Sequence, residues 1–346
     1  MKACFMGLGY IGLPTAIIAA KHGVQVTGVD INPRVVEMTN KGKLHIIEPG
    51  MEEMLQEVVA SGALKASTTP EVSDAYFMVV PTPFKGNHEP DTSYVEAATR
   101  AVLPLLKEGD LYVIESTSPV GTTDKMAALI FAERPELKDK IYIAYCPERV
   151  LPGNVIYELV HNDRVIGGMD EASTDKAIEF YSQFVTGQLH RTNCKTAEMC
   201  KLTENSSRDV QIAFANELSL ICDKAGINVW ELINLANKHP RVNILQPGCG
   251  VGGHCIAVDP YLPEGNTHFF RPSDKFYFEL DLWETDFEDP EETALKIADL
   301  RFVLERGFDL KKHVMDYMNS LPLVPGYQEP IRSAFRRYIK FMRTGI

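Results

Sequence analysis

The segment PGCGVGGHCIAVDP, residues 247–260, holds two cysteines and a histidine among glycines. It is too irregular for a helix and too polar for a buried strand, so we predict a loop. Glycine lets a loop approach a ligand closely, and an accessible thiolate is a strong nucleophile. The pattern leaves open whether Cys255 is an accessible, reactive thiol or a buried structural one.

A second group of candidate ligand-binding side chains lies on a long predicted helix. Lys201, Asn205 and Arg208 are spaced i, i+4 and i+7, which places them on one helix face. They could converge on one ligand, or they could form a polar stripe that faces water.

Polar side chains also follow strands that are predicted in the first half of the chain. The strand patterns lie within residues 75–83, 111–121, 141–150 and 163–168. Ligands of such sheets bind outside the carboxyl ends of the strands, so Thr82, Thr117 and Glu148 should line one crevice. The alternatives are ordinary turn hydroxyls for the threonines and a salt bridge to Arg149 for Glu148.

The first thirty residues predict a dinucleotide-binding unit. A strand runs into GLGYIG, a helix follows, and a second strand ends at Asp30. Gly7 permits the tight turn, Gly9 lets the backbone approach a pyrophosphate, and Gly12 allows close helix packing. The Asp30 carboxylate would accept hydrogen bonds from a ribose diol and repel a 2′-phosphate, which favours NAD over NADP. A plain glycine-rich turn is the alternative.

Helices are predicted beyond the sheet. The long helix covers residues 196–225, and the next begins at Asn228, which fits a capping box with Glu231. His239 and Arg241 fall in the loop that follows, where they suit anionic or polyhydroxy groups.

Composition narrows the class of protein. The chain has 346 residues, 45% of them hydrophobic, which predicts two or three domains. A formal net charge of −12 argues against nucleic acid and anionic membranes as partners. The seven cysteines lack paired CxxC spacing, which argues against a zinc site and a disulfide framework. With no leader pattern and no long apolar run, we expect a cytoplasmic protein without a bound metal.

Residues 1 to about 262 resemble the UDP-glucose/UDP-mannuronic acid dehydrogenase family. The matching stretches include GLGYIGLPTA, VPTPFKG, ESTSPVGTT, YCPERVLPG, NDRVIGGM, the helix TAEMCKLTENSSRDVQIAFANELSLICDKA, and GVGGHCIAVDP. The resemblance implies an α/β fold with a Rossmann-type doubly wound parallel sheet. It further implies an NAD-binding domain over residues 1–190, a helical central and dimerisation region over 191–262, and a homodimer.

The same resemblance implies an NAD-dependent, four-electron oxidation of a sugar CH2OH to a carboxylate, with UDP as the handle. Cys255 would add to the aldehyde, so that a thiohemiacetal is oxidised to a thioester and then hydrolysed. The implied catalytic residues are Cys255, Lys201, Asn205, Glu148, Asp259 and Thr117. The implied NAD-binding residues are Gly7, Gly9, Tyr10, Ile11, Gly12, Asp30, Arg34, Thr82 and Thr117. The implied substrate-binding residues are Arg149, Val150, Lys201, Asn205, Arg208, His239, Arg241 and Gly252. For Arg34, a solvated cation at a helix start is the alternative.

Two positions bear on the sugar. Val258 stands where UDP-glucose dehydrogenases usually have lysine, and His254 precedes the cysteine. Both resemble the branch that oxidises UDP-N-acetyl-D-mannosamine for bacterial surface polysaccharides. UDP-glucose, UDP-N-acetylglucosamine and UDP-N-acetylgalactosamine stay open as substrates.

Residues 263–346 depart from the family, because the strands and basic helix of its third, UDP-clamping domain are not recognisable there. Loss of remote binding energy should lower turnover as well as affinity. Two interpretations follow: an active UDP-sugar 6-dehydrogenase, or a non-catalytic NAD-binding paralogue.

Overall fold

The computed structural model describes residues 1–248, apart from 47, 86–88 and 151–152. Within this part, the chain forms two units, residues 1–214 and residues 215–248. Gly252, Cys255 and Asp259, in the segment that the sequence predicts as a loop, lie outside the described residues, as does the atypical segment 263–346.

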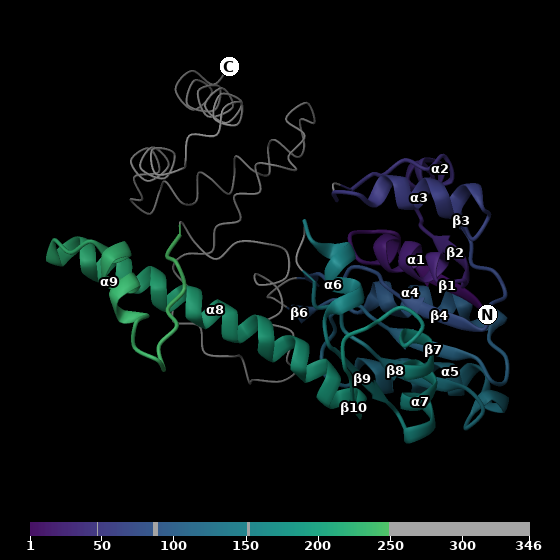
Figure 1. Cartoon of the computed structure of the whole chain (residues 1–346). Helices are drawn as coiled ribbons and strands as arrows, with labels where there is room; N and C mark the ends of the chain where they lie inside the picture. Colours follow the sequence, from purple (N-terminus) through teal and green to yellow (C-terminus); the bar gives the residue numbers. More distant parts are fainter. Residues whose placement is uncertain (47, 86–88, 151–152, 249–346) are drawn as a thin grey trace, which may run out of the picture. The chain divides into compact units, whose positions relative to one another are not determined.

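The first unit is built on an eight-stranded sheet in the order β10-β9-β8-β7-β4-β1-β2-β3 (Figure 1). Its strands are β1 (Lys2–Met6), β2 (Gln25–Val29), β3 (Leu64–Ser67), β4 (Ala75–Met78), β7 (Leu111–Ile114), β8 (Tyr142–Tyr145), β9 (Arg164–Gly168) and β10 (Leu189–Asn193). A separate two-stranded ladder pairs β5 (Phe84–Lys85) with β6 (Glu89–Pro90).

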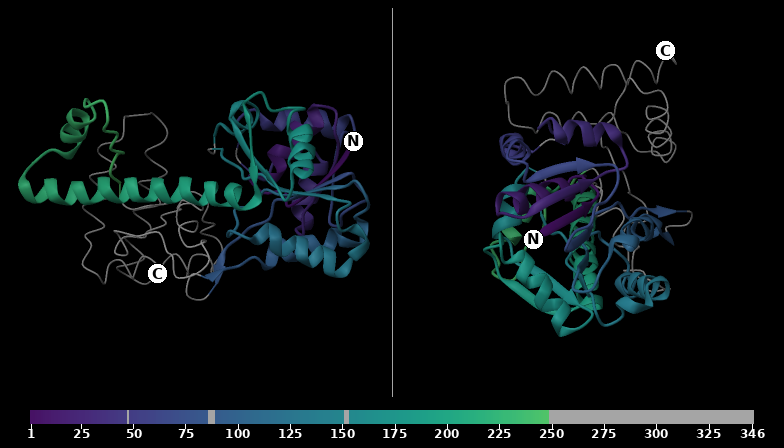
Figure 2. Two further views of the ribbon diagram at one scale, coloured as in Figure 1. Left: turned by 90° about the horizontal axis from the view of Figure 1, so that it is seen from below. Right: turned by 90° about the vertical axis from the view of Figure 1, so that its right-hand side faces the viewer.

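Helices cover both faces of this sheet, as the two views of Figure 2 show. They are α1 (Gly12–Lys21), α2 (Pro33–Asn40), α3 (Met51–Ala60), α4 (Ser93–Val102), α5 (Thr122–Glu133), α6 (Val155–His161) and α7 (Glu171–Tyr181), with short 3-10 turns at Leu103–Leu105 and Pro135–Leu137. Strand side chains alternate between two hydrophobic cores, because successive residues of a strand point to opposite faces. Leu111 and Val113 join the core of α1, α3 and α7, whereas Tyr112 and Ile114 join that of α4 and α5.

The Rossmann-type doubly wound fold that the sequence predicted is confirmed, with one correction in strand direction. The β9 strand is antiparallel to β8, and β10 is parallel to β9, so the sheet is mixed. The connection from β8 to β9 contains only the seven-residue α6, and β9 therefore starts at the edge where β8 ends. Strands β3 and β10 were not among those predicted.

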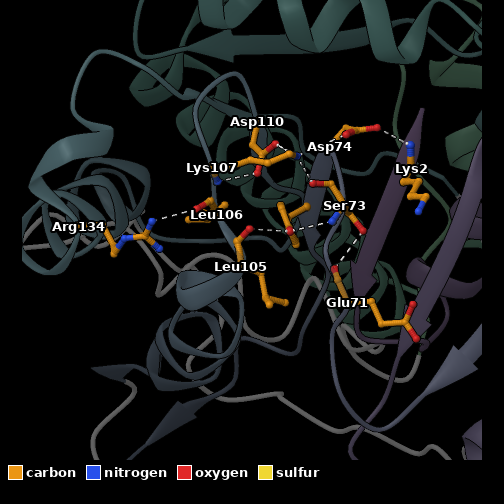
Figure 3. A network of polar contacts seen from close by, with 10 residues as sticks. Lys2, Glu71, Ser73, Asp74, Leu105, Leu106, Lys107, Asp110 and Arg134 are labelled. Carbon is orange, nitrogen blue, oxygen red and sulfur yellow. Dashed lines mark hydrogen bonds and ion pairs between the residues drawn. The ribbon is translucent and has the colours of Figure 1, made fainter.

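A polar network closes the opposite edge of the sheet, where β1, β4 and β7 begin (Figure 3). The Lys107 ammonium donates to the carbonyl of Ser73 at 2.8 Å and to carboxylate oxygens of Asp74 and Asp110. The backbone N–H of Lys2 donates to Asp74 at 2.8 Å. We call Lys107, Asp74 and Asp110 the amino-edge network, because they hold together the amino ends of three strands.

The helix α8 (Cys194–Ala225) follows β10 directly and continues into the second unit, where α9 (Val229–Ala236) comes next. Gly226 ends α8 with a φ of 68°, a conformation that glycine adopts without strain. The Asn228 side chain accepts the N–H groups of Trp230 and Glu231, as the predicted cap requires. None of the helices in the described part of the chain is long and apolar enough to cross a membrane.

Candidate functional site

Each of the three glycines of the nucleotide motif is explained by a different feature of the structure. Gly7 has a φ of 105°, and a Cβ there would lie 2.2 Å from the Val79 carbonyl oxygen. A Cβ on Gly12 would lie 1.9 Å from the Gly7 carbonyl oxygen. A Cβ on Gly9 would meet nothing within 4 Å, so the backbone there borders open space. This open space at the start of α1 fits a pyrophosphate.

Asp30 is fixed beside the same loop. One carboxylate oxygen accepts the Leu8 N–H at 3.1 Å, and the other accepts the Asn32 N–H at 2.9 Å. Both bonds orient the carboxylate at the carboxyl end of β2, where a ribose diol is expected. The open space at Gly9 and the oriented carboxylate of Asp30 therefore fit an NAD molecule.

The remaining predicted NAD residues lie around this loop. Ile11 is the residue before α1, and Tyr10 is 39% exposed. Arg34 lies exposed in the first turn of α2. Thr82 and Thr117 follow β4 and β7, and the Thr82 hydroxyl donates to the Thr117 carbonyl oxygen. The structure thus brings the two threonines together at the carboxyl edge of the sheet.

An open pocket of about 470 Å³ collects the predicted substrate-binding residues of the first unit. Arg149 and Val150 line it from the segment after β8, and Lys201, Asn205 and Arg208 line it from α8. The shared helix face predicted for the last three is therefore confirmed. Acidic and amide side chains complete the wall: Glu158, Asn162, Asp163 and Glu204.

Of the three cationic side chains that line this pocket, Arg149 has an ion-pair partner among the described residues, and Lys201 and Arg208 have none. The Arg149 guanidinium binds both carboxylate oxygens of Glu204, at 2.7 and 3.0 Å, and also donates to the Asp163 carbonyl. Lys201 and Arg208 make no ion pair with any residue in the described ranges. Two cations are therefore ready to bind an anionic or oxygen-rich ligand.

Glu148 has a different partner from the Arg149 salt bridge that the sequence offered as an alternative. One carboxylate oxygen accepts a hydrogen bond at 3.3 Å from the buried guanidinium of Arg164, the first residue of β9. The other accepts the backbone N–H of Arg149. The antiparallel return of β9 places Arg164 opposite Glu148, whereas the Arg149 side chain reaches Glu204 on α8.

A second buried acid, Glu115, interacts with the charge of Arg164. The hydroxyl of Tyr181 donates to one oxygen of Glu115, and the Arg164 guanidinium lies 4.9 Å from the centre of the Tyr181 ring. Burial raises the pKa of Glu115 to about 7, against the opposing charge of Arg164. Burial also raises the pKa of the Cys146 thiol, which contacts Arg164, to about 12. We call Glu115, Glu148, Arg164, Tyr181 and Cys146 the carboxyl-edge cluster.

Glu198 attaches the first turns of α8 to the sheet. Its fully buried carboxylate accepts the N–H groups of Gly121 and Thr123 and the hydroxyl of Thr123. These donors lie at the start of α5, where a helix dipole favours an anion. Lys201, one turn further along α8, is thereby held in a fixed position.

His239 and Arg241 belong to the second unit, in the turn after α9, where the Arg241 N–H approaches His239 Nδ1 at 3.4 Å. The side-chain oxygen of Asn216 on α8 accepts the Gly248 N–H at 2.8 Å, so the chain returns to α8 at the start of the segment 247–260. Gly252, Cys255 and Asp259 lie outside the described residues.

Sequence reasoning missed Glu115, Arg164, Glu198 and Glu204. A charged residue inside or directly after an apolar strand, as in LYVIE and DRVIGG, is the signal that could have found the first two. The other two look like surface charges on a long helix and become notable only through their distant partners.

Comparisons with known proteins match two stretches of this chain to one family. Residues 1–185 match the NAD binding domain of the UDP-glucose/GDP-mannose dehydrogenase family, and residues 195–264 match its central domain. A UDP-N-acetyl-D-mannosamine dehydrogenase from Campylobacter jejuni is 60% identical over 75% of this chain and 66% of its own length. An NDP-N-acetyl-D-galactosaminuronic acid dehydrogenase from Ralstonia nicotianae is 56% identical over 74% of this chain and 62% of its own length.

Among solved structures, a UDP-N-acetyl-D-mannosamine dehydrogenase from Pyrococcus horikoshii has a TM-score of 0.73 at 46% identity. The similarity covers 78% of this chain and 66% of that one. The chain thus spans just under two thirds of the relatives that it matches. By the match of both domains, the chain belongs to the UDP-glucose/GDP-mannose dehydrogenase family.

Proposed function

We propose that this protein oxidises the C6 hydroxyl of UDP-N-acetyl-D-mannosamine to the carboxylate in two NAD-dependent steps. One observation carries the proposal: Arg149, Val150, Lys201, Asn205 and Arg208 line one pocket in the unit that also holds the dinucleotide motif. These residues come from two segments of the chain, so their convergence supports a common ligand. The similarity to proteins named for this substrate supports the choice of sugar.

The dinucleotide would be held by the loop from Gly7 to Gly12, with Asp30 on the ribose. NAD, when bound, supplies the hydride acceptor for each oxidation. The residues of the chain orient it: the Gly9 backbone leaves room for the phosphates, and the exposed Tyr10 borders the same space. Thr82 and Thr117 would lie at the nicotinamide end, at the carboxyl edge of the sheet.

Lys201 and Asn205 would act at the sugar carbon. Removal of the C6 hydroxyl proton leaves negative charge on oxygen, which a nearby ammonium stabilises. Because Lys201 has no ion-pair partner within residues 1–248 as described, its charge is available for this purpose. Asn205, one turn away, would donate its amide hydrogen to the same oxygen.

Cys255 would hold the half-oxidised sugar. Thiolate addition to the aldehyde gives a tetrahedral carbon that bears a second transferable hydride, and its oxidation leaves a thioester. Glu148 would then remove a proton from water, which attacks the thioester carbonyl and releases the carboxylate and the thiol. Asp259 would assist near Lys201. Two hydrides and one water thus account for the conversion of alcohol to acid.

A second sugar is favoured by one observation. The relative from Ralstonia nicotianae is named for a galactosaminuronic acid and is nearly as similar as the mannosamine enzymes. Both sugars carry an acetamido group at C2, so the proposal covers UDP-N-acetylgalactosamine as the alternative substrate.

A homodimer in the cytoplasm is part of the proposal, as is a role in surface polysaccharide synthesis. Apolar side chains exposed along α8 support the dimer, with Phe214 56% and Ile221 54% exposed. Sedimentation of the wild type against Phe214→Asp tests it: the variant should be monomeric, and an unchanged mass would contradict the dimer at this face.

The activity is tested with a panel of UDP-sugars, with NADH absorbance as the readout. UDP-N-acetyl-D-mannosamine should give the highest kcat/KM, and NADH from no UDP-hexose would overturn the proposal. Cys255→Ser should stop steady turnover, while Cys249→Ser, six residues earlier in the same loop, should retain it. Equal rates for both variants would rule out covalent catalysis by Cys255.

A further inference from the structure

We propose that Glu115 is a positioning residue, sharing one proton with Glu148 across the Arg164 guanidinium and thereby setting the basicity of Glu148. The inference deepens the proposed function and rests on it, because Glu148 is the base of the hydrolysis step there. Glu115 belongs to no motif used above, and its side chain is 2% exposed.

The strand pattern places all members of the cluster on one face of the sheet. Glu115 follows Ile114 of β7, and alternation turns it to the core that contains Tyr181 and Cys146. Arg164 begins β9, which runs antiparallel to β8, so that it lies opposite Glu148. Residues from three strand ends and from α7 therefore meet at one buried point.

The cluster does not balance its charge if both acids are ionised. Arg164 is the only cation that the described residues place against Glu115 and Glu148, and its side chain is 5% exposed. Two buried carboxylates with one guanidinium leave one negative charge unpaired, which is costly in a low-dielectric interior. One proton removes that cost.

The hydrogen bonds identify Glu115 as the acid that holds this proton at rest. Glu148 has a partner on each oxygen, Arg164 on one and the Arg149 N–H on the other. Glu115 receives only the Tyr181 hydroxyl, and its second oxygen has no partner among the described residues. An unpartnered buried oxygen costs less on a neutral acid than on a carboxylate.

The other titratable groups that face Glu115 do not take the proton. Burial raises the pKa of Cys146 to about 12 and that of Tyr181 well above its usual value, so both stay protonated at neutral pH. The pKa of Arg164 is raised as well, mainly by Glu148 against the effect of burial, and it stays charged. Of this cluster, Glu115 is therefore the group whose pKa burial brings close to neutral pH.

This arrangement makes the state of Glu115 control Glu148. While Glu115 is neutral, the Arg164 guanidinium balances the Glu148 carboxylate alone. Once Glu115 ionises, the guanidinium is shared and the two carboxylates repel each other, which favours proton removal from water by Glu148. The hydrolysis step should therefore speed up as the pH rises through neutrality.

An infrared titration tests the shared proton without turnover, from about pH 5 to about pH 9. The wild type should lose a buried COOH band near neutral pH, and Glu115→Gln should lack this band. Glu148→Gln removes the repelling charge, so the band should disappear at a pH lower by about one unit or more. The proposal is overturned if the wild type shows no such band, or if the band of Glu148→Gln disappears at the same pH as that of the wild type.

Kinetics then test the consequence for the base. In Glu115→Gln, the rise of kcat across neutral pH should disappear, with KM for the sugar changed less than kcat. Tyr181→Phe removes a hydroxyl that stabilises ionised Glu115, so its rise should move to higher pH. Loss of the rise in Glu115→Gln and its displacement in Tyr181→Phe are not expected together from a loss of packing alone, and profiles that match the wild type contradict the inference.

The two proposals fail in distinguishable ways. A wild type that makes no NADH with any UDP-sugar overturns the proposed function, whatever the infrared band does. A wild type that turns over, with pH profiles unchanged in both variants, overturns the role of Glu115 alone.

Discussion

Two polar groups at opposite edges of the same sheet contain the same charges. The amino-edge network has the acids Asp74 and Asp110 around one base, Lys107, and the carboxyl-edge cluster has Glu115 and Glu148 around Arg164. Each group has one acid that is 2% exposed, Asp110 or Glu115. The other acid and the base differ: the side chains of Asp74 and Lys107 are 52% and 49% exposed, whereas those of Glu148 and Arg164 are 9% and 5% exposed.

This difference separates an ion network that stabilises the fold from a buried group that titrates near neutral pH. At the amino edge, Asp74 is half exposed, and both oxygens of the buried Asp110 accept hydrogen bonds from Lys107. At the carboxyl edge, both acids are buried, and one oxygen of Glu115 has no partner among the described residues. Burial raises the pKa of Asp110 as well, but hydrogen bonds from Lys107 to both of its oxygens oppose that rise. Glu115 accepts only the Tyr181 hydroxyl among the described residues, so its pKa rises to about 7.

Replacement of the buried base should have the largest effect. Arg164→Met leaves two buried acids without a cation and should lower the free energy of unfolding by about 3–5 kcal/mol at neutral pH. The matched change at the exposed edge, Lys107→Met, should cost about 1 kcal/mol, because water replaces part of the lost interaction. Urea unfolding of both variants measures the difference, and equal costs would break the comparison.

The pH dependence of stability should show an intermediate effect at the buried edge. The pKa of Glu115 is raised to about 7, so the folded state binds an extra proton between pH 4.5 and about 7, and stability falls as the pH rises through that window. Glu115→Gln removes this titrating group, so the variant should not lose this stability as the pH rises. Across the window, the free energy of unfolding of the variant should therefore rise relative to that of the wild type by up to about 3 kcal/mol.

Urea midpoints at a series of pH values between these limits supply this measurement. A stability difference that stays constant with pH would show that Glu115 is ionised throughout.

The exposed edge should give the smallest effect, with the opposite sign. The hydrogen bond from the Lys2 N–H, with help from Lys107, lowers the pKa of Asp74. Its contribution is present above the usual pKa of an aspartate and disappears as the pH falls through the lowered value. The free energy of unfolding of the wild type should fall in acid partly because Asp74 is protonated there. Asp74→Asn should reduce this fall by less than about 1 kcal/mol, because Asp74 is half exposed. Thermal unfolding in acid checks this, and a larger change would mean that exposure does not separate the two edges.

Local patterns predicted much of the fold and part of the site. The roles of Gly7, Gly9 and Gly12 follow from backbone geometry within a few residues, and the shared face of Lys201 and Arg208 follows from helical spacing. Such features need no knowledge of distant contacts.

What the sequence could not predict depends on contacts between distant segments. The direction of β9 decides which side chain lies opposite Glu148, and strand direction leaves no mark on the alternation of apolar residues. The binding of Glu198 to the start of α5 and of Arg149 to Glu204 likewise depends on where α8 begins against the sheet. Charged residues carry little information about their partners until the chain is folded.

The most direct test of the proposed oxidation is the yield of NADH when UDP-N-acetyl-D-mannosamine is limiting and NAD is in excess. We predict two NADH for each sugar consumed, together with one equivalent of the carboxylate product, because the aldehyde stays bound until the second hydride leaves. A yield of one NADH with free aldehyde in solution, or no NADH at all, would contradict the two-step oxidation.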